Sequence, residues 1–385
     1  MGAKVHIFLL ICKLSALIFS LNDDFCDFFL VFSDFYAIFA SINITAMRKF
    51  GLLALVLLLV SGLSLAKTPK RQASYAIGFY NLENLFDTCH DEGKNDYEFL
   101  AEGSYHWTGD KYIHKLANMS RVLSELGTDL LPDIGCAAIG VAEVENARCL
   151  TDLINQPSLK ARNIQFIHIE GPDQRGIDCA LLYNPALFTV RDASLIPYIY
   201  TRPEDAGRAT RGFLVVSGTL AGEHVTIIVN HLPSRGALSY AREDGGTQLR
   251  AVKDSILKDD PNVKLLIMGD MNDDPQDPSM AVCLGAKREI SEVDEGGLWN
   301  PWWNELASGN GTLKFEGAWN LFDQIILSKS LLGGKGLQYS GHQIFRPDYL
   351  LQGPGPYWGS PLRTTAGGQW LNGFSDHLPT VVYLK

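Results

Sequence analysis

The chain of 385 residues has little positive charge and few cysteines. Its 33 Lys and Arg residues stand against 43 Asp and Glu residues, so the net charge is −10. An acidic chain has no overall field that draws it onto nucleic acid or anionic lipid, so phosphate chemistry here needs a local basic cleft or metal ions. Seven cysteines are too few for a disulfide-stapled scaffold, and the absence of a C-x-x-C pair beyond residue 66 disfavours zinc.

The sequence also has no internal repeat, no heptad run and no linker of biased composition. Helical patterns occur at residues 110–126, 149–154 and 248–257. Between and around them the sequence has strand-like apolar runs, at residues 74–81, 139–144, 164–169, 177–183, 212–220, 224–229, 264–268, 324–327 and 380–384. These mixed signals predict a layered α/β or α+β domain rather than two tandem domains. One domain of about 310 residues is larger than usual, which favours two sheets packed face to face with outer helices.

A leader precedes this domain. Residues 47–66 begin with Met47-Arg48-Lys49, continue with an apolar stretch and end with the small residue Ala66, which is the pattern of a secretory signal peptide. The apolar stretch is shorter than the ~20 residues that a membrane span requires. We therefore predict cleavage after Ala66, a secreted or periplasmic location, and no membrane span in the mature chain of residues 67–385.

Residues 1–46 are difficult to reconcile with a signal peptide that belongs at the true N-terminus. They are rich in Phe and Ile and carry four Asp residues without a clear period. One interpretation is an additional membrane segment over residues 5–21, interrupted by Lys13. The favoured interpretation is a non-native upstream extension, with translation beginning at Met47.

Polar side chains gather where the predicted strands end. Carboxylates, amides and histidines follow or begin apolar runs in six clusters, at residues 80–84, 141–146, 229–232, 268–272, 322–325 and 375–379. Charged groups in such positions cost several kcal/mol to desolvate unless they bind a metal, a ligand or each other. Each residue taken singly also fits a turn or cap role, but six such clusters in one chain favour a site for phosphoester chemistry.

The order and spacing of these clusters resemble the endonuclease/exonuclease/phosphatase superfamily. The matching residues are Asn81, Glu83, Glu143, Asn230, His231, Gly269-Asp270-Met271-Asn272, Asp323 and Ser375-Asp376-His377, and the resemblance covers residues 74–385. The superfamily includes pancreatic-type deoxyribonucleases, abasic-site endonucleases, inositol-polyphosphate phosphatases and neutral sphingomyelinases. Its members are four-layer α/β-sandwiches, so the resemblance implies that fold here. Residues 81–87 further resemble a secreted bacterial nuclease-like branch.

The resemblance implies a divalent-metal site. Glu143 would be the principal ligand, with Asn81, Glu83 and Asp376 around the same ion. Mg²⁺ suits such a set because it takes oxygen ligands and binds through one or two carboxylates; Mn²⁺ and Ca²⁺ remain alternatives. Glu145 would share a face with Glu143 on an extended strand. We prefer Glu143 because the glutamate of the family lies where the apolar strand ends.

The resemblance also implies catalytic roles. His377 would lie against the phosphorus, oriented by Asp323, and His231 with Asn230 would donate to phosphate oxygens. Asp270 could take the proton from the attacking water while Asn272 holds that water in place. Whether Asp270 or His377 is the general base stays open.

The substrate follows less directly from the sequence. Arg235 lies just after His231 and is expected to bind a phosphate of the substrate. We expect a metal-dependent phosphodiester hydrolase, with a nuclease favoured and nucleic acid as its partner. The alternatives are a phosphatase or phosphodiesterase acting on small or lipid phosphates and, less favoured, a non-catalytic binding module. No stable protein partner is implied.

Overall fold

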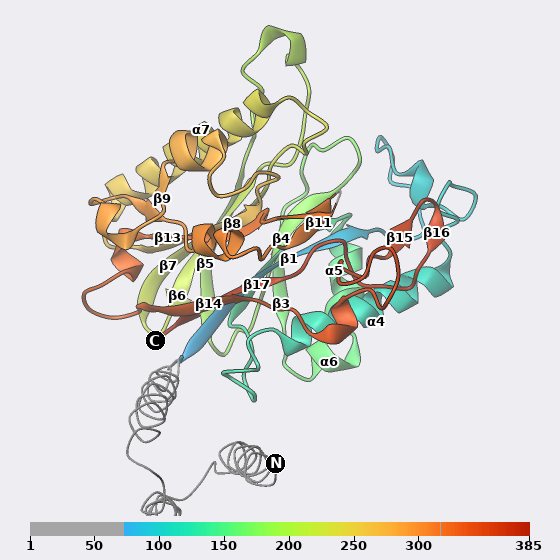
Figure 1. Cartoon of the computed structure of the whole chain (residues 1–385), viewed down its shortest axis with the longest axis horizontal. Coiled ribbons are helices and arrows are strands. Elements are labelled where there is room, and N and C mark those ends of the chain that lie inside the picture. The colour runs from blue at the N-terminus through green and yellow to red at the C-terminus, as the bar shows by residue number, and fades with distance from the viewer. Residues whose placement is uncertain (1–72, 316) are drawn as a thin grey trace, which may run out of the picture. The chain divides into compact units, whose positions relative to one another are not determined.

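Two mixed β-sheets form the centre of the protein, and the computed structural model describes residues 73–385 except residue 316 (Figure 1). The first sheet has the order β14-β17-β1-β2-β4-β3, and the second has the order β5-β6-β7-β8-β13-β10-β9. The first consists of β1 (Tyr75–Leu85), β2 (Ala138–Val144), β3 (Gln165–His168), β4 (Asp178–Tyr183), β14 (Tyr339–Ile344) and β17 (Thr380–Leu384). The second consists of β5 (Phe188–Ile196), β6 (Phe213–Leu220), β7 (Glu223–His231), β8 (Lys264–Asp270), β9 (Ala286–Lys287), β10 (Leu298–Trp299) and β13 (Asp323–Ser328).

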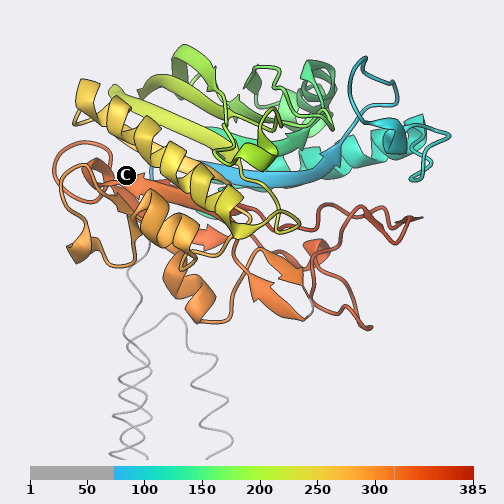
Figure 2. The ribbon, with the colours of Figure 1, turned by 90° about the horizontal axis from the view of Figure 1, so that it is seen from above.

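Helices cover the outer faces of both sheets. The helices are α4 (Gly109–Glu125), α5 (Ala147–Ile154), α6 (Pro157–Lys160), α7 (Ser239–Asp259) and α8 (Trp302–Ala307). In Figure 1, α4 and α7 lie on different sides of the strands, and Figure 2 shows α7 (yellow) running along one outer face. Two short ribbons, β11–β12 (Leu313–Phe315 and Ala318–Asn320) and β15–β16 (Thr365–Ala366 and Gln369–Trp370), complete the strands of the described residues.

Three apolar layers hold these four layers of secondary structure together. Alternate side chains of a strand point to opposite faces of its sheet. In β1, Ile77 and Phe79 pack between the two sheets, whereas Tyr80 packs under α4 with the first outer layer. In β8, Met268 joins the layer between the sheets and Ile267 lies in the layer beneath α7. The predicted four-layer α/β-sandwich is therefore confirmed.

Among the longer elements, two strands and half of one helix were not predicted, and neither were the short helices α6 and α8 or the two- and three-residue strands. β5 and β14 are only partly buried, so their sequences lack the apolar run of a central strand. α7 begins at Ser239, nine residues before the predicted start, and includes Gly245 and Gly246. A Cβ on Gly246 would lie 2.1 Å from the carbonyl oxygen of Ser279. Close packing of the helix explains these glycines, which otherwise disfavour a helix.

The predicted leader cannot be compared with the structure. Residues 1–46 and the predicted signal peptide, residues 47–66, lie outside the described residues. Within residues 73–385, residue 316 aside, no helix combines the length and apolar character that crossing a membrane requires.

Candidate active site

Strand pairing in the second sheet places three of the predicted site residues in one row. β7 and β8 run parallel, with His231 opposite Asp270 at their carboxyl ends. β13 runs antiparallel to β8, and Asp323, its first residue, is the direct partner of Asp270. Partners on neighbouring strands lie about 4.5–5.5 Å apart, so the register alone gathers these side chains at one edge of the sheet.

The first sheet supplies Asn81 and Glu143 from the parallel strands β1 and β2. The register of this pair is interrupted just after Asn81, and Glu143 has a φ of 62°. Three further residues of the site region have positive φ, namely Glu83 (48°), Asn84 (59°) and Asn272 (51°). Such backbone conformations cost on the order of 1 kcal/mol each in residues other than glycine. These backbone conformations are therefore maintained by contacts with the surrounding structure.

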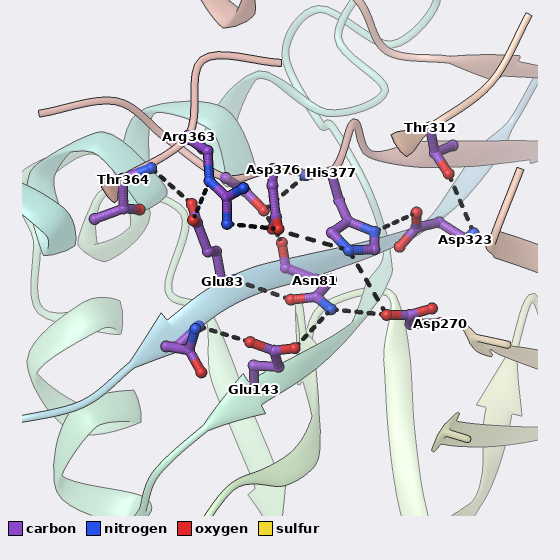
Figure 3. Close-up of polar contacts among 12 residues, drawn as sticks. Asn81, Glu83, Glu143, Asp270, Thr312, Asp323, Arg363, Thr364, Asp376 and His377 are labelled. Carbon is purple, nitrogen blue, oxygen red and sulfur yellow. Dashed lines mark hydrogen bonds and ion pairs between the residues drawn. The ribbon is translucent and has the colours of Figure 1, made fainter. Parts of the chain in front are cut away.

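Asn81 joins the two sheets at the centre of the site (Figure 3). Its Nδ2 donates to Glu143 Oε1 at 3.2 Å and to Asp270 Oδ2 at 2.9 Å, and its Oδ1 accepts from the amide of Glu83. His231 Nε2 lies 3.5 Å from Asp270 Oδ2 and 3.9 Å from Glu143 Oε1. One ligand atom from each of Glu143, His231 and Asp270 lies within 4.8 Å of the others. Two carboxylates from different sheets thus converge with an imidazole.

His377 and Asp323 form a buried pair beside this group. His377 Nδ1 lies 2.7 Å from Asp323 Oδ2, and its Nε2 is directed toward Asp270 Oδ2 at 3.7 Å (Figure 3). Burial alone would lower the pKa of His377, but the Asp323 and Asp270 charges raise it well above its ordinary value. The two acids therefore favour the positively charged imidazolium form of His377, whose Nε2 side faces the carboxylate group.

Burial shifts the pKa values of His231 and Asp270, which lie beside His377, in opposite directions. Burial lowers the pKa of His231 well below its ordinary value, and the Arg211 and His377 charges lower it further. Burial raises the pKa of Asp270 to about 7, against the opposing effect of His377. Burial alone would favour the neutral form of both histidines, so the acids around His377 create the difference between them.

Glu83 and Asp376 are not part of the Glu143 group. Both are ion-paired to Arg363, whose Nε lies 3.1 Å from Glu83 Oε1 and whose Nη2 lies 3.1 Å from Asp376 Oδ2 (Figure 3). The second carboxylate oxygen of Glu83 accepts from the amide of Thr364 at 2.6 Å. The prediction that these two acids surround one metal together with Glu143 therefore differs from the observed pairing.

Asn230, Asn272 and Arg235 also depart from their predicted positions. Asn230 is fully buried, and its Nδ2 donates to the carbonyl of Met268 instead of facing the row, because neighbouring residues of a strand point to opposite faces. The Nδ2 of Asn272 donates to the carbonyl of Leu232. Arg235 pairs with Asp273, Asp274 and Asp277, so its charge is neutralised within the protein and not offered to a phosphate.

Several residues that support the site were not predicted. Ser375 Oγ donates to the carbonyl of Asn81 and accepts from the amide of His377, which ties the turn before β17 to β1. Thr312 Oγ1 accepts from the amide of Asp323. Ser375 lies within the Ser-Asp-His motif, so the sequence carried a signal for it. Thr312 and Arg363 lie in loops without a recognisable pattern.

Glu145 belongs to a different cluster from Glu143. The positive φ of Glu143 breaks the alternation of β2, so the two side chains do not share a face as an extended strand would require. Glu145 instead accepts from the amide of Asp87 and lies near Cys149, buried beneath α5. The five cysteines of the described residues are all unpaired thiols.

The residues present fit a hard divalent cation. Two carboxylates and a neutral imidazole converge within 4.8 Å, and the Glu143 side chain keeps 15% of its surface exposed. Oxygen-rich sets of this kind suit Mg²⁺ or Mn²⁺, which bind through one or two carboxylates. Glu143 would be the principal ligand of the ion, with Asp270 and His231 beside it.

The fold and this group of side chains together define a class, that of α/β-sandwich hydrolases of phosphoric esters. A family model described as "Endonuclease/Exonuclease/phosphatase family" matches residues 76–385. The chain therefore belongs to the endonuclease/exonuclease/phosphatase family, as the sequence motifs predicted. It is a metal-dependent phosphoric ester hydrolase.

Solved structures resemble the chain at low sequence identity, and one of them, with a TM-score above 0.5, shows the same fold. A mannosyl-6-phosphatase from Bacteroides thetaiotaomicron has a TM-score of 0.51 and 14% identity, with 81% of this chain and 100% of that chain covered. A humanised TDP2 from D. rerio has a TM-score of 0.49 and 14% identity, covering 81% and 98%. The human Nocturnin catalytic domain with bound sulfate has a TM-score of 0.46 and 15% identity, covering 82% and 95%. Among curated proteins, none matches the chain significantly.

Proposed function

We propose that this protein is a Mg²⁺-dependent phosphodiesterase that hydrolyses its substrate by in-line attack of water, with nucleic acid as the favoured substrate. The observation that carries the proposal is the convergence of Asn81, Glu143, Asp270, His231 and the His377–Asp323 pair from two sheets. Each buried ionisable group costs free energy to desolvate, so a purely structural role does not explain why so many of them lie in one place.

The proton positions assign a role to each side chain. Asp270, whose pKa is raised to about 7, is suited to accept the proton of the attacking water. His377 is held as an imidazolium by Asp323, so its Nε2–H can donate to a phosphate oxygen as negative charge develops there. Neutral His231 donates a second hydrogen bond from the neighbouring strand. When bound, the divalent ion would supply positive charge next to the phosphate oxygens.

The nuclease proposal rests on the resemblance of residues 81–87 to the nuclease-like branch. A second candidate, a hydrolase of small phosphate esters, is favoured by one observation. Arg235 and Arg363 at the site, and Arg211 nearby, all pair with carboxylates of the chain. Guanidinium groups that are already neutralised contribute little to binding a polyanion.

We also propose that the protein is exported, with cleavage after Ala66. The proposal is supported by the charged start, apolar centre and small C-terminal residue of 47–66. Intact mass of the exported protein tests it, because a first residue other than Lys67 would refute the cleavage site.

A substrate panel with and without EDTA tests the proposed activity. The panel contains duplex DNA, single strands, RNA, a bis-aryl phosphate, inositol phosphates and sphingomyelin. His377→Ala should lower kcat/KM at least about 100-fold, whereas His114→Ala, on the exposed side of α4, should leave it unchanged. Activity that EDTA does not affect, or that His377→Ala retains, would refute the proposal.

Salt dependence separates the two substrate classes. Binding of a polyanion through several phosphates weakens steeply with rising salt, with a log–log slope near the number of contacts. A small phosphate ester gives a shallow slope. A shallow slope with DNA would favour the second candidate.

A further inference from the structure

The acidic site is divided into two parts by an arginine. Glu143 and Asp270 form one part with His231. Glu83 and Asp376 form the other part, with Arg363 between them (Figure 3). In the described residues, neither Glu83 nor Asp376 belongs to any group of three side chains whose ligand atoms lie within 4.8 Å. β1 contributes a residue to each part, Asn81 to the first and Glu83, two residues further along, to the second.

Glu83 has both carboxylate oxygens engaged by the protein. One accepts from Arg363 Nε and the other from the Thr364 amide, and the residue is only 4% exposed. Lys115, fully buried on α4, adds a second positive charge nearby and donates to Thr364 Oγ1 and to the carbonyl of Phe374. A carboxylate enclosed in this way by donors and positive charge is a poor ligand for a further cation.

Arg363 places a positive charge between Glu83 and Asp376, where a metal ion would otherwise be needed. Its planar guanidinium donates through two different nitrogens to two carboxylates that arrive from opposite ends of the chain, β1 and the turn before β17. Arginine keeps its charge at all accessible pH values, and its fork matches carboxylate geometry. A divalent ion between the same two acids would lie beside a guanidinium of like charge.

We infer that the guanidinium of Arg363 takes the place of a metal ion between Glu83 and Asp376 and holds both acids in ion pairs. The metal ion is therefore confined to the Glu143 group, and one ion binds per chain. This inference rests on the proposed function only in taking the Glu143 group as the metal site. The pair also positions the turn that carries His377, because it connects Asp376 to β1.

Titration of the purified protein with Mn²⁺, followed through the EPR signal of free Mn²⁺, tests the inference without an activity assay. Wild type should bind one ion. Glu83→Gln should change the dissociation constant by less than about threefold, whereas Glu143→Gln should weaken it about tenfold or more. Arg363→Gln frees the two acids and should add a second ion, and Arg363→Lys, which keeps the charge, should not.

Arg288→Gln is the matched control for the lost charge, because Arg288 is an exposed residue that contacts Asn304 and Glu289. It should still bind one ion. Two ions bound by wild type, or a Glu83→Gln effect as large as that of Glu143→Gln, would overturn this inference while leaving the proposed function intact. A wild-type protein that binds no Mn²⁺ would overturn both. Melting temperatures of all variants establish that they are folded.

Discussion

Replacing Asp323 by Asn tests the role of the buried His377–Asp323 pair most directly. Asn keeps an acceptor for His377 Nδ1 at the same position but removes a negative charge 2.7 Å from the ring, where both side chains are almost fully buried. Removing the charge lowers the pKa of His377, because Asp323 is the largest of the influences that raise it. The imidazolium population at neutral pH therefore falls.

Two magnitudes follow from this change. Loss of a charge-assisted hydrogen bond should lower the free energy of unfolding by about 2 kcal/mol. Loss of the oriented, charged imidazole should lower kcat/KM about 100- to 10,000-fold at pH 7. Because the folded-state pKa of His377 is raised, the stability that the pair contributes is fully present below the unfolded pKa of about 6.5 and is lost as pH rises through the folded pKa.

The pH profile of kcat/KM is the deciding assay. If His377 acts as an imidazolium, the alkaline decline of activity should move to lower pH in Asp323→Asn. If it acts as a neutral base, the acidic rise should move to lower pH instead, which would refute the assignment. A rate loss of less than tenfold with an unchanged profile would contradict the reasoning altogether. Asp192→Asn, an exposed acid on β5, is the control and should change neither rate nor profile.

Three further predictions concern stability. Burial raises the pKa of Glu145 to about 8, so the folded state keeps a proton that the unfolded state releases. The free energy of unfolding of the wild type should therefore fall by about 2 kcal/mol between pH 6 and pH 8. Glu145→Gln should abolish this fall in urea unfolding, and an unchanged pH dependence would exclude Glu145 as its source. Trp302→Ala should cost about 3–5 kcal/mol, because this fully buried ring also donates to the carbonyl of Ile325; a loss below 1 kcal/mol would refute its place in the core. Gly246→Ala should lower the melting temperature despite a helix-propensity gain of about 1 kcal/mol, since its Cβ would overlap the Ser279 carbonyl, whereas Gly109→Ala meets nothing within 4 Å and should not lower it.

The regular parts of the fold could be predicted because they depend on local pattern. Apolar alternation located β1, β2, β4, β6, β7, β8, β13 and β17, and helical spacing located α4 within one residue at each end. Prediction failed where tertiary contacts outweigh local preference. The glycines of α7 are tolerated because Gly246 packs closely against the segment of residues 279–284 and Gly245 against Leu232. Trp299 and Trp302 lie in a segment without a strand or helix pattern, yet both are buried against the second sheet.

The sequence by itself determined which residues gather at the site. Asn81, His231, Asp270 and Asp323 end or begin apolar runs, and the resemblance of their order to the family implied that they share one site. Only the tertiary structure decided how those residues are divided among partners. The left-handed backbone at Glu143 separates it from Glu145, and Arg363, from a loop far along the chain, pairs with Glu83. Contacts between residues distant in sequence depend on how loops fold against the strands, and no local periodicity records them.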